Sequence, residues 1–291
     1  MKVSGFTIAR NVVRADYPLR EAVFSVLPLC HEFIIAVGKS EDETLEYVRS
    51  FDDARIKIIE TIWDDSLREG GRVLAQETDK AKAAVSSDSD WLFYIQADEC
   101  LHEKYVSNVQ NAMEKHVQNP KVEGLLFDYE HFYGSYDYTG DSRKWYRREV
   151  RIIRNRPDIF SYRDAQGFRK LPNEKLQVAH CNAEIFHYGW VKHPREQQQK
   201  QMQFHRMWHD DAYMQKHVES GEQFDYSGID SLAKFEGTHP AVMKERIQRM
   251  NWSFDYDISN KKFSLKNRFL YFVEKLTGWR PGEYKNYELL K

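Results

Sequence analysis

Two adjacent carboxylates, Asp98 and Glu99, follow directly after a run of strand-forming residues at positions 91–96. Carboxylate oxygens are the ligands that Mg²⁺ and Mn²⁺ prefer, and the end of a buried strand holds such ligands rigidly. Because adjacent side chains of a strand point to opposite faces, we expect one carboxylate to bind a metal and the other to cap a helix or orient a loop. The alternative is an acidic helix start with no chemistry.

His187 is a second candidate ligand, and it lies in a strand-like segment at residues 185–191. A neutral imidazole can complete a metal site that carboxylates begin. The alternative is a core histidine whose ring bonds to a backbone carbonyl.

Asp164 is a candidate base, in a polar segment at residues 162–167. A loop carboxylate beside an aromatic wall can take a proton from a sugar hydroxyl. The alternative is an aspartate that stabilises a turn.

Basic side chains and a glycine pair are candidates for binding phosphate. Arginine presents a planar fork of donors that suits phosphate oxygens, and Gly70-Gly71 before a helix leaves backbone N–H groups free for an anion. The chain has no Walker or Gly-x-Gly-x-x-Gly motif, so a dinucleotide fold has little support. We expect most of the arginines to be solvated. The basic candidates are Lys39, Arg72, Arg147, Arg148, Arg151 and Arg154.

The first hundred residues alternate between strand and helix patterns. This alternation is typical of an α/β fold, a parallel sheet with helices on its faces, in which ligands bind beyond the carboxyl ends of the strands. Ser40 and Glu43 fit a capping box for the second helix. The predicted strands span residues 3–13, 31–37, 55–62 and 91–96, and the predicted helices span residues 18–27, 40–51 and 72–86.

The rest of the chain predicts an extension of this α/β unit. Strand patterns occur at residues 122–132, 149–154 and 185–191, and helical patterns at residues 195–218, 240–250 and 264–276. No Pro- or Ser-rich linker separates a second domain. We therefore expect a catalytic domain at residues 1–192, with a nucleotide-binding half at about 1–100 and an acceptor half at about 101–192, and a helical C-terminal extension at residues 193–291 packed on it.

Composition and charge exclude several classes of protein. A net charge of −2 with both signs mixed argues against nucleic-acid binding. Three scattered cysteines are too few for a disulfide framework. No apolar run approaches a membrane span, so we expect a soluble, cytoplasmic protein. Residues 261–271 mix basic and apolar side chains and can rest on the inner face of an anionic membrane; the alternative is a plain packing helix.

The chain resembles bacterial family 2 glycosyltransferases, which have the GT-A fold. The resemblance covers about residues 1–190. It rests on the strand end Thr-Ile-Ala-Arg-Asn at 7–11, the turn Ser-Glu-Asp-Glu-Thr at 40–44, Trp-Asp-Asp at 63–65, Gln-Ala-Asp-Glu at 96–99, and His187, which is similar to the late metal-binding histidine of the family.

The resemblance implies a mostly parallel central sheet and an inverting transfer of a sugar. The donor would be a nucleotide-diphosphate sugar, UDP- or GDP-linked, and the acceptor a hydroxyl of a cell-surface glycan or lipid-linked precursor. It implies that Asp98 and His187 bind Mn²⁺ or Mg²⁺ and that Asp164 is the catalytic base. It implies that the nucleotide sugar contacts Thr7, Ala9, Arg10, Lys39, Trp63, Arg72, Gln96 and Ala97.

Two residues depart from the family pattern. Gln96 stands where the family carries an aspartate that faces the ribose, although an amide can still hydrogen-bond a hydroxyl. Gly38 stands where the second strand of the family usually ends in an aspartate that contacts the base.

Two other functions stay open. A sugar nucleotidyltransferase would usually show a Gly-rich, Lys-bearing loop after the first strand, and a non-catalytic nucleotide- or glycan-binding module is favoured by Gln96.

Overall fold

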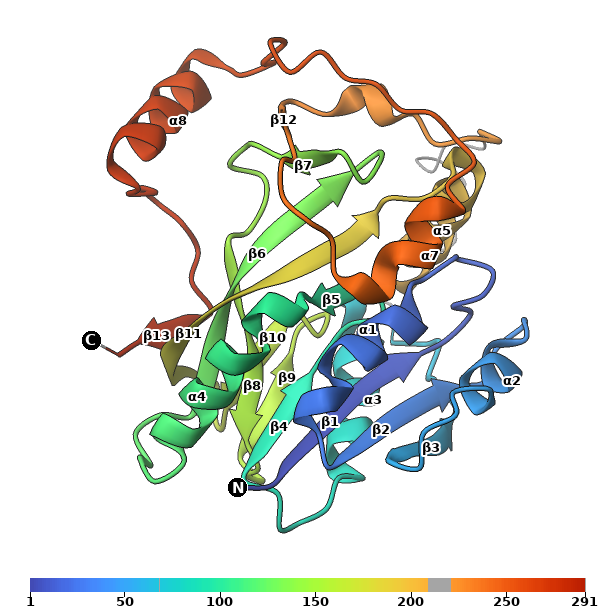
Figure 1. Cartoon of the computed structure of the whole chain (residues 1–291), viewed down its shortest axis with the longest axis vertical. Helices are drawn as coiled ribbons and strands as arrows, with labels where there is room; N and C mark the ends of the chain where they lie inside the picture. The colour runs from blue at the N-terminus through green and yellow to red at the C-terminus, as the bar shows by residue number, and fades with distance from the viewer. Residues whose placement is uncertain (68, 209–220, 291) are drawn as a thin grey trace.

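The computed structural model describes residues 1–67, 69–208 and 221–290, and these form a mixed α/β fold on a central mixed sheet (Figure 1). The main strand order is β3-β2-β1-β4-β8-β6-β11-β10-β9. The strands are β1 Val3–Ala9, β2 Glu32–Gly38, β3 Ile56–Thr61, β4 Trp91–Tyr94, β5 Glu99–Leu101, β6 Gly124–Tyr133, β7 Tyr138–Gly140, β8 Arg148–Arg154, β9 Ile159–Tyr162, β10 Gly167–Lys170, β11 Glu174–Trp190, β12 Leu232–Lys234 and β13 Tyr287–Leu289. The helices are α1 Leu19–Val26, α2 Thr44–Arg49, α3 Arg72–Ala83, α4 Val106–His116, α5 Pro194–Trp208, α7 Lys244–Gln248 and α8 Leu265–Thr277.

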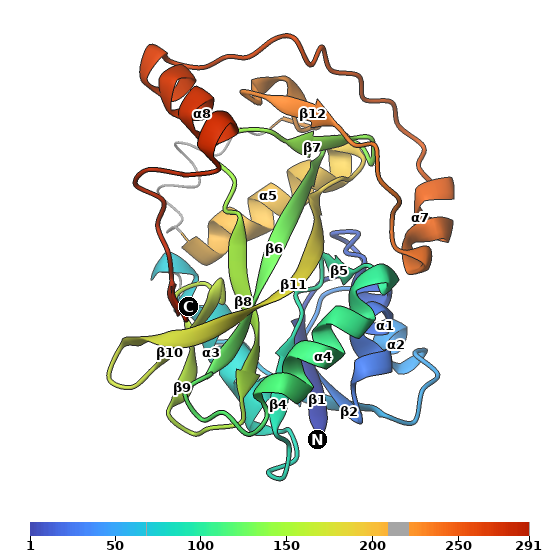
Figure 2. The ribbon, with the colours of Figure 1, turned by 60° about the vertical axis from the view of Figure 1, so that its left-hand side comes forward.

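The first four strands of the chain form the parallel half of the sheet. β1 pairs in parallel with β2 and β4, and β2 pairs in parallel with β3. Every residue of β2 and β4 is buried, because α1, α2 and α4 pack on one face and α3 on the other (Figure 2). The predicted alternation of strands and helices in this half is confirmed, with ends that differ by a few residues.

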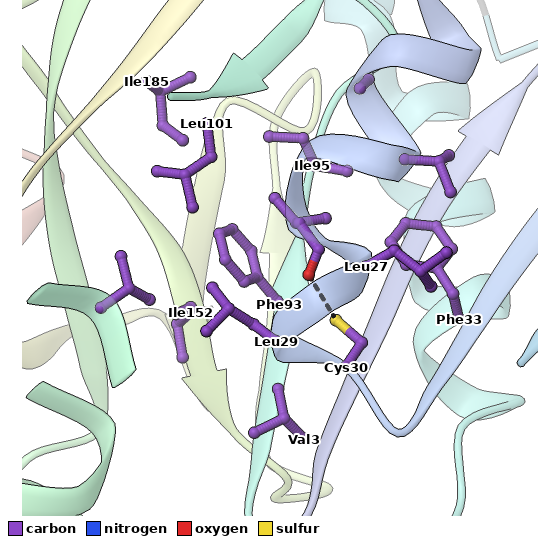
Figure 3. Packing of buried hydrophobic residues seen from close by; sticks show 14 of the residues in the cluster. Val3, Leu27, Leu29, Cys30, Phe33, Phe93, Ile95, Leu101, Ile152 and Ile185 are labelled. Carbon is purple, nitrogen blue, oxygen red and sulfur yellow. Dashed lines mark hydrogen bonds between the residues drawn. The ribbon is translucent and has the colours of Figure 1, made fainter. Parts of the chain in front are cut away.

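The core beneath α1 holds these strands in place. Phe33 of β2 and Phe93 of β4 pack with Leu27 and Cys30 (Figure 3). The Cys30 thiol donates a hydrogen bond to the Val26 carbonyl at 3.4 Å. This packing fixes the strands whose carboxyl ends carry the candidate site.

β8 joins the parallel half to the remaining strands by pairing antiparallel with β4 and β6, and β11 follows β6 in the sheet. β11 runs parallel to β6 and antiparallel to β5. In this register His187 lies opposite Glu99 on β5 and opposite His131 on β6. The pairing with β6 shifts register between His187 and Trp190. β11 therefore carries His187 to the turn that contains Asp98.

One local prediction is wrong. The capping box does not form: α2 begins at Thr44 without a side-chain cap, and the Ser40 hydroxyl instead donates to the Gly38 carbonyl at 2.9 Å. The helical pattern at residues 240–250 corresponds to a 3₁₀ turn, Ala241–Met243, that continues directly into the short helix α7. The predicted helix at 195–218 is α5 as far as Trp208, and residues 209–218 lie outside the described residues.

The residues after α5 add strands as well as helices. β12 pairs with β7, and β13 pairs in parallel with β11. The segment from α7 to β13 passes over the end of the molecule opposite the N-terminus and carries α8 there (Figures 1 and 2). No helix among the described residues has the length and apolar character needed to cross a membrane.

Candidate active site

A cavity of about 710 Å³ opens beyond the carboxyl ends of β1, β3 and β4. Parallel strands bring their carboxyl ends to one edge of a sheet, so distant parts of the chain meet here. The predicted site residues that line the cavity are Arg10, Trp63, Gln96, Ala97, Asp98, Asp164 and His187. The predicted residues that do not line it are Thr7, Ala9, Lys39 and Arg72.

Asp98 is a buried carboxylate with a cation already beside it. The Lys200 ammonium donates to Asp98 Oδ2 at 3.0 Å and to the Gly189 carbonyl at 2.7 Å. Burial by itself raises the pKa of Asp98, but the surrounding positive charge, that of Lys200 above all, outweighs burial and lowers the pKa below its ordinary value. The cavity wall therefore contains an ionised carboxylate at neutral pH.

A chain of hydrogen bonds fixes the ring orientation of His187. Burial holds the pKa of His131 well below its ordinary value, so this ring is neutral. His131 Nε2 lies 2.7 Å from the Tyr146 carbonyl, which can only accept, so Nε2 carries the hydrogen. His131 Nδ1 then accepts from His187 Nδ1 at 3.0 Å. Burial also lowers the pKa of His187, and its Nε2 is left with a free lone pair.

The gap between Asp98 and His187 suits a cation. Asp98 Oδ2 and His187 Nε2 lie 3.7 Å apart, and both are electron-rich. Gly189 keeps the gap open, since a Cβ there would lie 2.7 Å from each of the two atoms. No group of three or more His, Cys, Asp or Glu among the described residues can hold a metal. A divalent ion here would complete its coordination with oxygen atoms of water or of a substrate.

Glu99 anchors the turn that presents Asp98. Arg151 Nε and Nη2 donate to the two Glu99 oxygens at 2.9 and 2.8 Å, and both side chains are fully buried. The backbone N–H of Gln96 and the Tyr129 hydroxyl donate to the same carboxylate at 3.0 and 2.8 Å. Removing one partner of such a buried pair costs about 3–5 kcal/mol, so this network holds the turn rigidly.

The four arginines at 147–154 do not reach the cavity. Each is engaged with a carboxylate or with backbone carbonyls, and none lines the site. Their partners are Glu283 for Arg147, Asp128 for Arg148, Glu99 for Arg151, and the carbonyls of His116, Val117, Asn119 and Val122 for Arg154. Phosphate binding by these four arginines therefore stays an untested prediction, and none of them is placed at this cavity.

Asp164 lies on the turn between β9 and β10, half-buried in the cavity wall. Its neighbours Arg163 and Ala165 have φ values of 56° and 62°, a left-handed conformation that costs about 1–2 kcal/mol per non-glycine residue. The Gln96 side chain donates to the Ala165 carbonyl at 3.1 Å and ties the two turns together. Burial raises the pKa of Asp164, which makes its carboxylate a stronger base. A Cβ on Gly71 would lie 2.7 Å from Asp164 Cβ.

Arg10 and Trp63 form another wall of the cavity. The Arg10 guanidinium lies 5.3 Å from the centroid of the indole and pairs with Asp65 at 2.5 Å. The indole covers Gly38, where a Cβ would lie 2.2 Å from the ring nitrogen. Position 38 therefore has no room for an aspartate. The Trp63 indole N–H is buried against Gly38 and has no hydrogen-bond partner among the described residues.

Sequence reasoning missed Lys200, His131 and Tyr17. Lys200 lies on α5, 102 positions after its partner Asp98, in a glutamine-rich segment with no motif. Tyr17 lies between two lysines, with its ring centroid 4.9 Å from Lys200 Nζ and 4.5 Å from Lys192 Nζ. The aromatic segment at 131–138 could have pointed to His131, because β6 extends into it.

No family model matches the chain, and no curated protein matches it. Among solved structures it is similar to Staphylococcus aureus TarS 1–349 in complex with UDP, at 16% identity over 46% of this chain and 37% of that chain, with a TM-score of 0.36. A second structure of S. aureus TarS matches at 11% identity over 76% of this chain and 41% of that chain, with a TM-score of 0.43. It is also similar to glucosyl-3-phosphoglycerate synthase from Mycobacterium tuberculosis in complex with Mn²⁺, uridine-diphosphate and phosphoglyceric acid. The identity is 18% over 45% of this chain and 43% of that chain, and the TM-score is 0.30. The chain spans less than half the length of each of these three.

Proposed function

We propose that the protein is an inverting glycosyltransferase that uses a nucleotide-diphosphate sugar. The observation that carries the proposal is the convergence of Asp98, His187 and Asp164 on one cavity from three separate parts of the chain. These are the residues to which the motif resemblance assigns cation binding and base catalysis. Three properties of these residues support the proposal. Asp98 is ionised, a hydrogen bond fixes the orientation of the His187 ring, and burial raises the pKa of Asp164.

The donor would occupy the wall formed by Arg10, Trp63 and Gln96. The flat indole and guanidinium suit a nucleotide base, and the Gln96 amide suits the ribose hydroxyls. The diphosphate would lie next to Asp98, His187 and Lys200. A divalent cation, Mn²⁺ or Mg²⁺, held by Asp98 and His187 would neutralise the departing diphosphate. Thr7 and Ala9 are buried residues of β1 that do not line the cavity.

Asp164 would take the proton of the acceptor hydroxyl. The hydroxyl oxygen then forms a bond to the anomeric carbon as the bond from that carbon to the diphosphate oxygen breaks, so the configuration inverts. Burial favours this role because it strengthens the base. Gln96 positions the Asp164 turn through the Ala165 carbonyl. We propose a cell-surface glycan or lipid-linked acceptor, a catalytic unit at residues 1–192 and a supporting extension at 193–291.

The test is a panel of UDP- and GDP-sugars with Mn²⁺, in which donor hydrolysis and transfer are measured for the wild type and two variants. Asp164→Asn should lower turnover by at least about a hundredfold, within the usual range for a lost general base, and Asp98→Asn should lower it because the proposed cation loses a ligand. Asp88→Asn, at an exposed ion pair with Lys2, is the matched control and should keep full activity. Donor binding without turnover would indicate a binding module, and pyrophosphate release from a nucleoside triphosphate would indicate a nucleotidyltransferase.

A further inference from the structure

α8 presents an apolar face that no part of the described chain covers. Leu265, Phe269, Phe272 and Leu276 are 86%, 66%, 62% and 73% exposed. At about 100° per residue these four side chains fall within an arc of about 60° on the helix. Trp279, just beyond the helix, is also largely exposed. A continuous exposed stripe of this kind is rare on a surface that faces only water.

The opposite face of α8 is fastened to the rest of the protein. Glu274 accepts from the Arg143 guanidinium at 2.9 Å, and the Tyr271 hydroxyl donates to Asp141 at 2.6 Å. The helix is also well terminated, because the Ser264 hydroxyl caps its start and Gly278 ends it with a φ of 69°. The fold therefore holds α8 by its polar face and directs the apolar face outward.

Basic side chains border the apolar stripe. Lys266 and Arg268 are exposed and lie on opposite sides of it, about 100° and 60° from Leu265 around the helix. Neither pairs with a carboxylate of the described chain, whereas Glu274, the acidic residue of α8, is already neutralised by Arg143. An apolar stripe with cations at its borders is the arrangement of helices that lie in the interface of anionic membranes.

We propose that α8 docks the protein onto the surface of a bilayer that contains anionic lipids. Leu265, Phe269, Phe272 and Leu276 would enter the boundary between headgroups and acyl chains, and Lys266 and Arg268 would contact lipid phosphates. A second copy of the chain is a poorer occupant, since a two-fold contact through this face would bring the basic borders of two helices together without acids between them. The docking site lies at the end of the molecule opposite the N-terminus (Figures 1 and 2).

The experiment is flotation of the full chain with phosphatidylcholine vesicles, with and without phosphatidylglycerol. The wild type should float with the anionic vesicles and much less with phosphatidylcholine alone. Phe269→Ser/Phe272→Ser should abolish flotation, and Lys266→Glu/Arg268→Glu should weaken binding by about thirty-fold or more, since each basic residue near such a surface contributes about 1 kcal/mol. The matched controls are Ile62→Ser, an exposed apolar residue elsewhere, and Lys115→Glu/Lys121→Glu, an equal change of charge on and beyond α4.

Equal flotation of the wild type and the α8 variants, or no flotation of the wild type, would overturn the proposal. So would a concentration-dependent dimer that Phe269→Ser/Phe272→Ser abolishes while vesicles bind nothing. Melting curves of each variant show that it is folded. Lipid binding does not depend on the proposed transferase activity, so Asp98→Asn should float like the wild type, and the two proposals can fail separately.

Discussion

His131 and His187 share a hydrogen bond between their Nδ1 atoms at 3.0 Å, and the Tyr146 carbonyl sets its direction. The arrangement leaves His187 Nε2 unprotonated toward Asp98. Replacing His131 with Phe should remove this constraint and weaken Mn²⁺ binding by about 10–100-fold, the usual effect of losing a group that orients a metal ligand. Electron paramagnetic resonance of free Mn²⁺ measures the affinity directly. His116→Phe at the end of α4 is the control, and equal affinities in the two variants would contradict the hydrogen-bond chain.

Lys200 should compete with a divalent cation for Asp98. In Lys200→Met the Asp98 carboxylate loses its bonded cation, so the metal-free protein should be destabilised by about 3 kcal/mol. Mn²⁺ should then restore more stability to the variant than it adds to the wild type. Thermal melts with and without Mn²⁺ measure the two shifts. Identical shifts would show that the cation and the ammonium occupy separate places.

Gly189 should be needed for the gap between Asp98 and His187. A Cβ at this position lies 2.7 Å from both ligand atoms, so Gly189→Ala should push them apart and abolish Mn²⁺ binding while the sheet stays folded. Gly228→Ala is the matched control, because nothing lies within 4 Å of a Cβ there. Calorimetric titration with Mn²⁺ distinguishes the two, and unchanged binding in Gly189→Ala would exclude the gap as the cation site.

Gly70 and Gly71 offer a paired test of Asp164. Both have positive φ, 63° and 68°, so alanine costs a similar backbone strain at either position. Only at Gly71 does the added Cβ meet Asp164, at 2.7 Å. Gly71→Ala should therefore lower kcat by at least about tenfold, as expected for a displaced base, with little change in donor affinity. If both variants lose the same activity, the contact with Asp164 has no functional role.

Glu149 should make the stability of the protein fall as the pH rises. Burial raises the pKa of its carboxyl from 4.5 to about 8. Between these values the folded protein keeps the proton and the unfolded chain has released it, so raising the pH favours unfolding until about pH 8, above which the effect is constant. Glu149→Gln should flatten the dependence of the unfolding free energy on pH in this window. Glu222→Gln, an exposed position, should leave the slope intact.

The parallel half of the sheet could be predicted because strands such as β2 and β4 are short, almost wholly apolar runs. β2 and β4 are buried on both faces, and their apolar runs end abruptly in polar residues that lie at the edge of the sheet. Gln96 and Asp98, which follow β4, line the cavity as that pattern predicts. The glycine pair before α3 was also recognisable from the sequence as a break in the chain, but the close approach of Gly71 to Asp164 was not.

The electrostatic partners of the site could not be predicted. Lys200 meets Asp98 only after α5 has packed across the sheet, and nothing in its local sequence distinguishes it from a solvated lysine. The burial of Arg151 against Glu99 is likewise a consequence of tertiary packing, so a cluster of arginines resembled a phosphate site. The capping box failed because Ser40 bonds to the end of β2 instead of to the helix.

β11 organises the cation gap: it carries His187 and Gly189, pairs with the strand that begins at Glu99, and pairs with the strand that carries His131. A slip of one residue along β6 would turn His187 to the opposite face of the sheet. The cation gap can therefore exist only in the correctly paired protein. Binding of Mn²⁺ would report whether β11 has paired in register with β5 and β6, and during refolding it should not appear before these two pairings have formed.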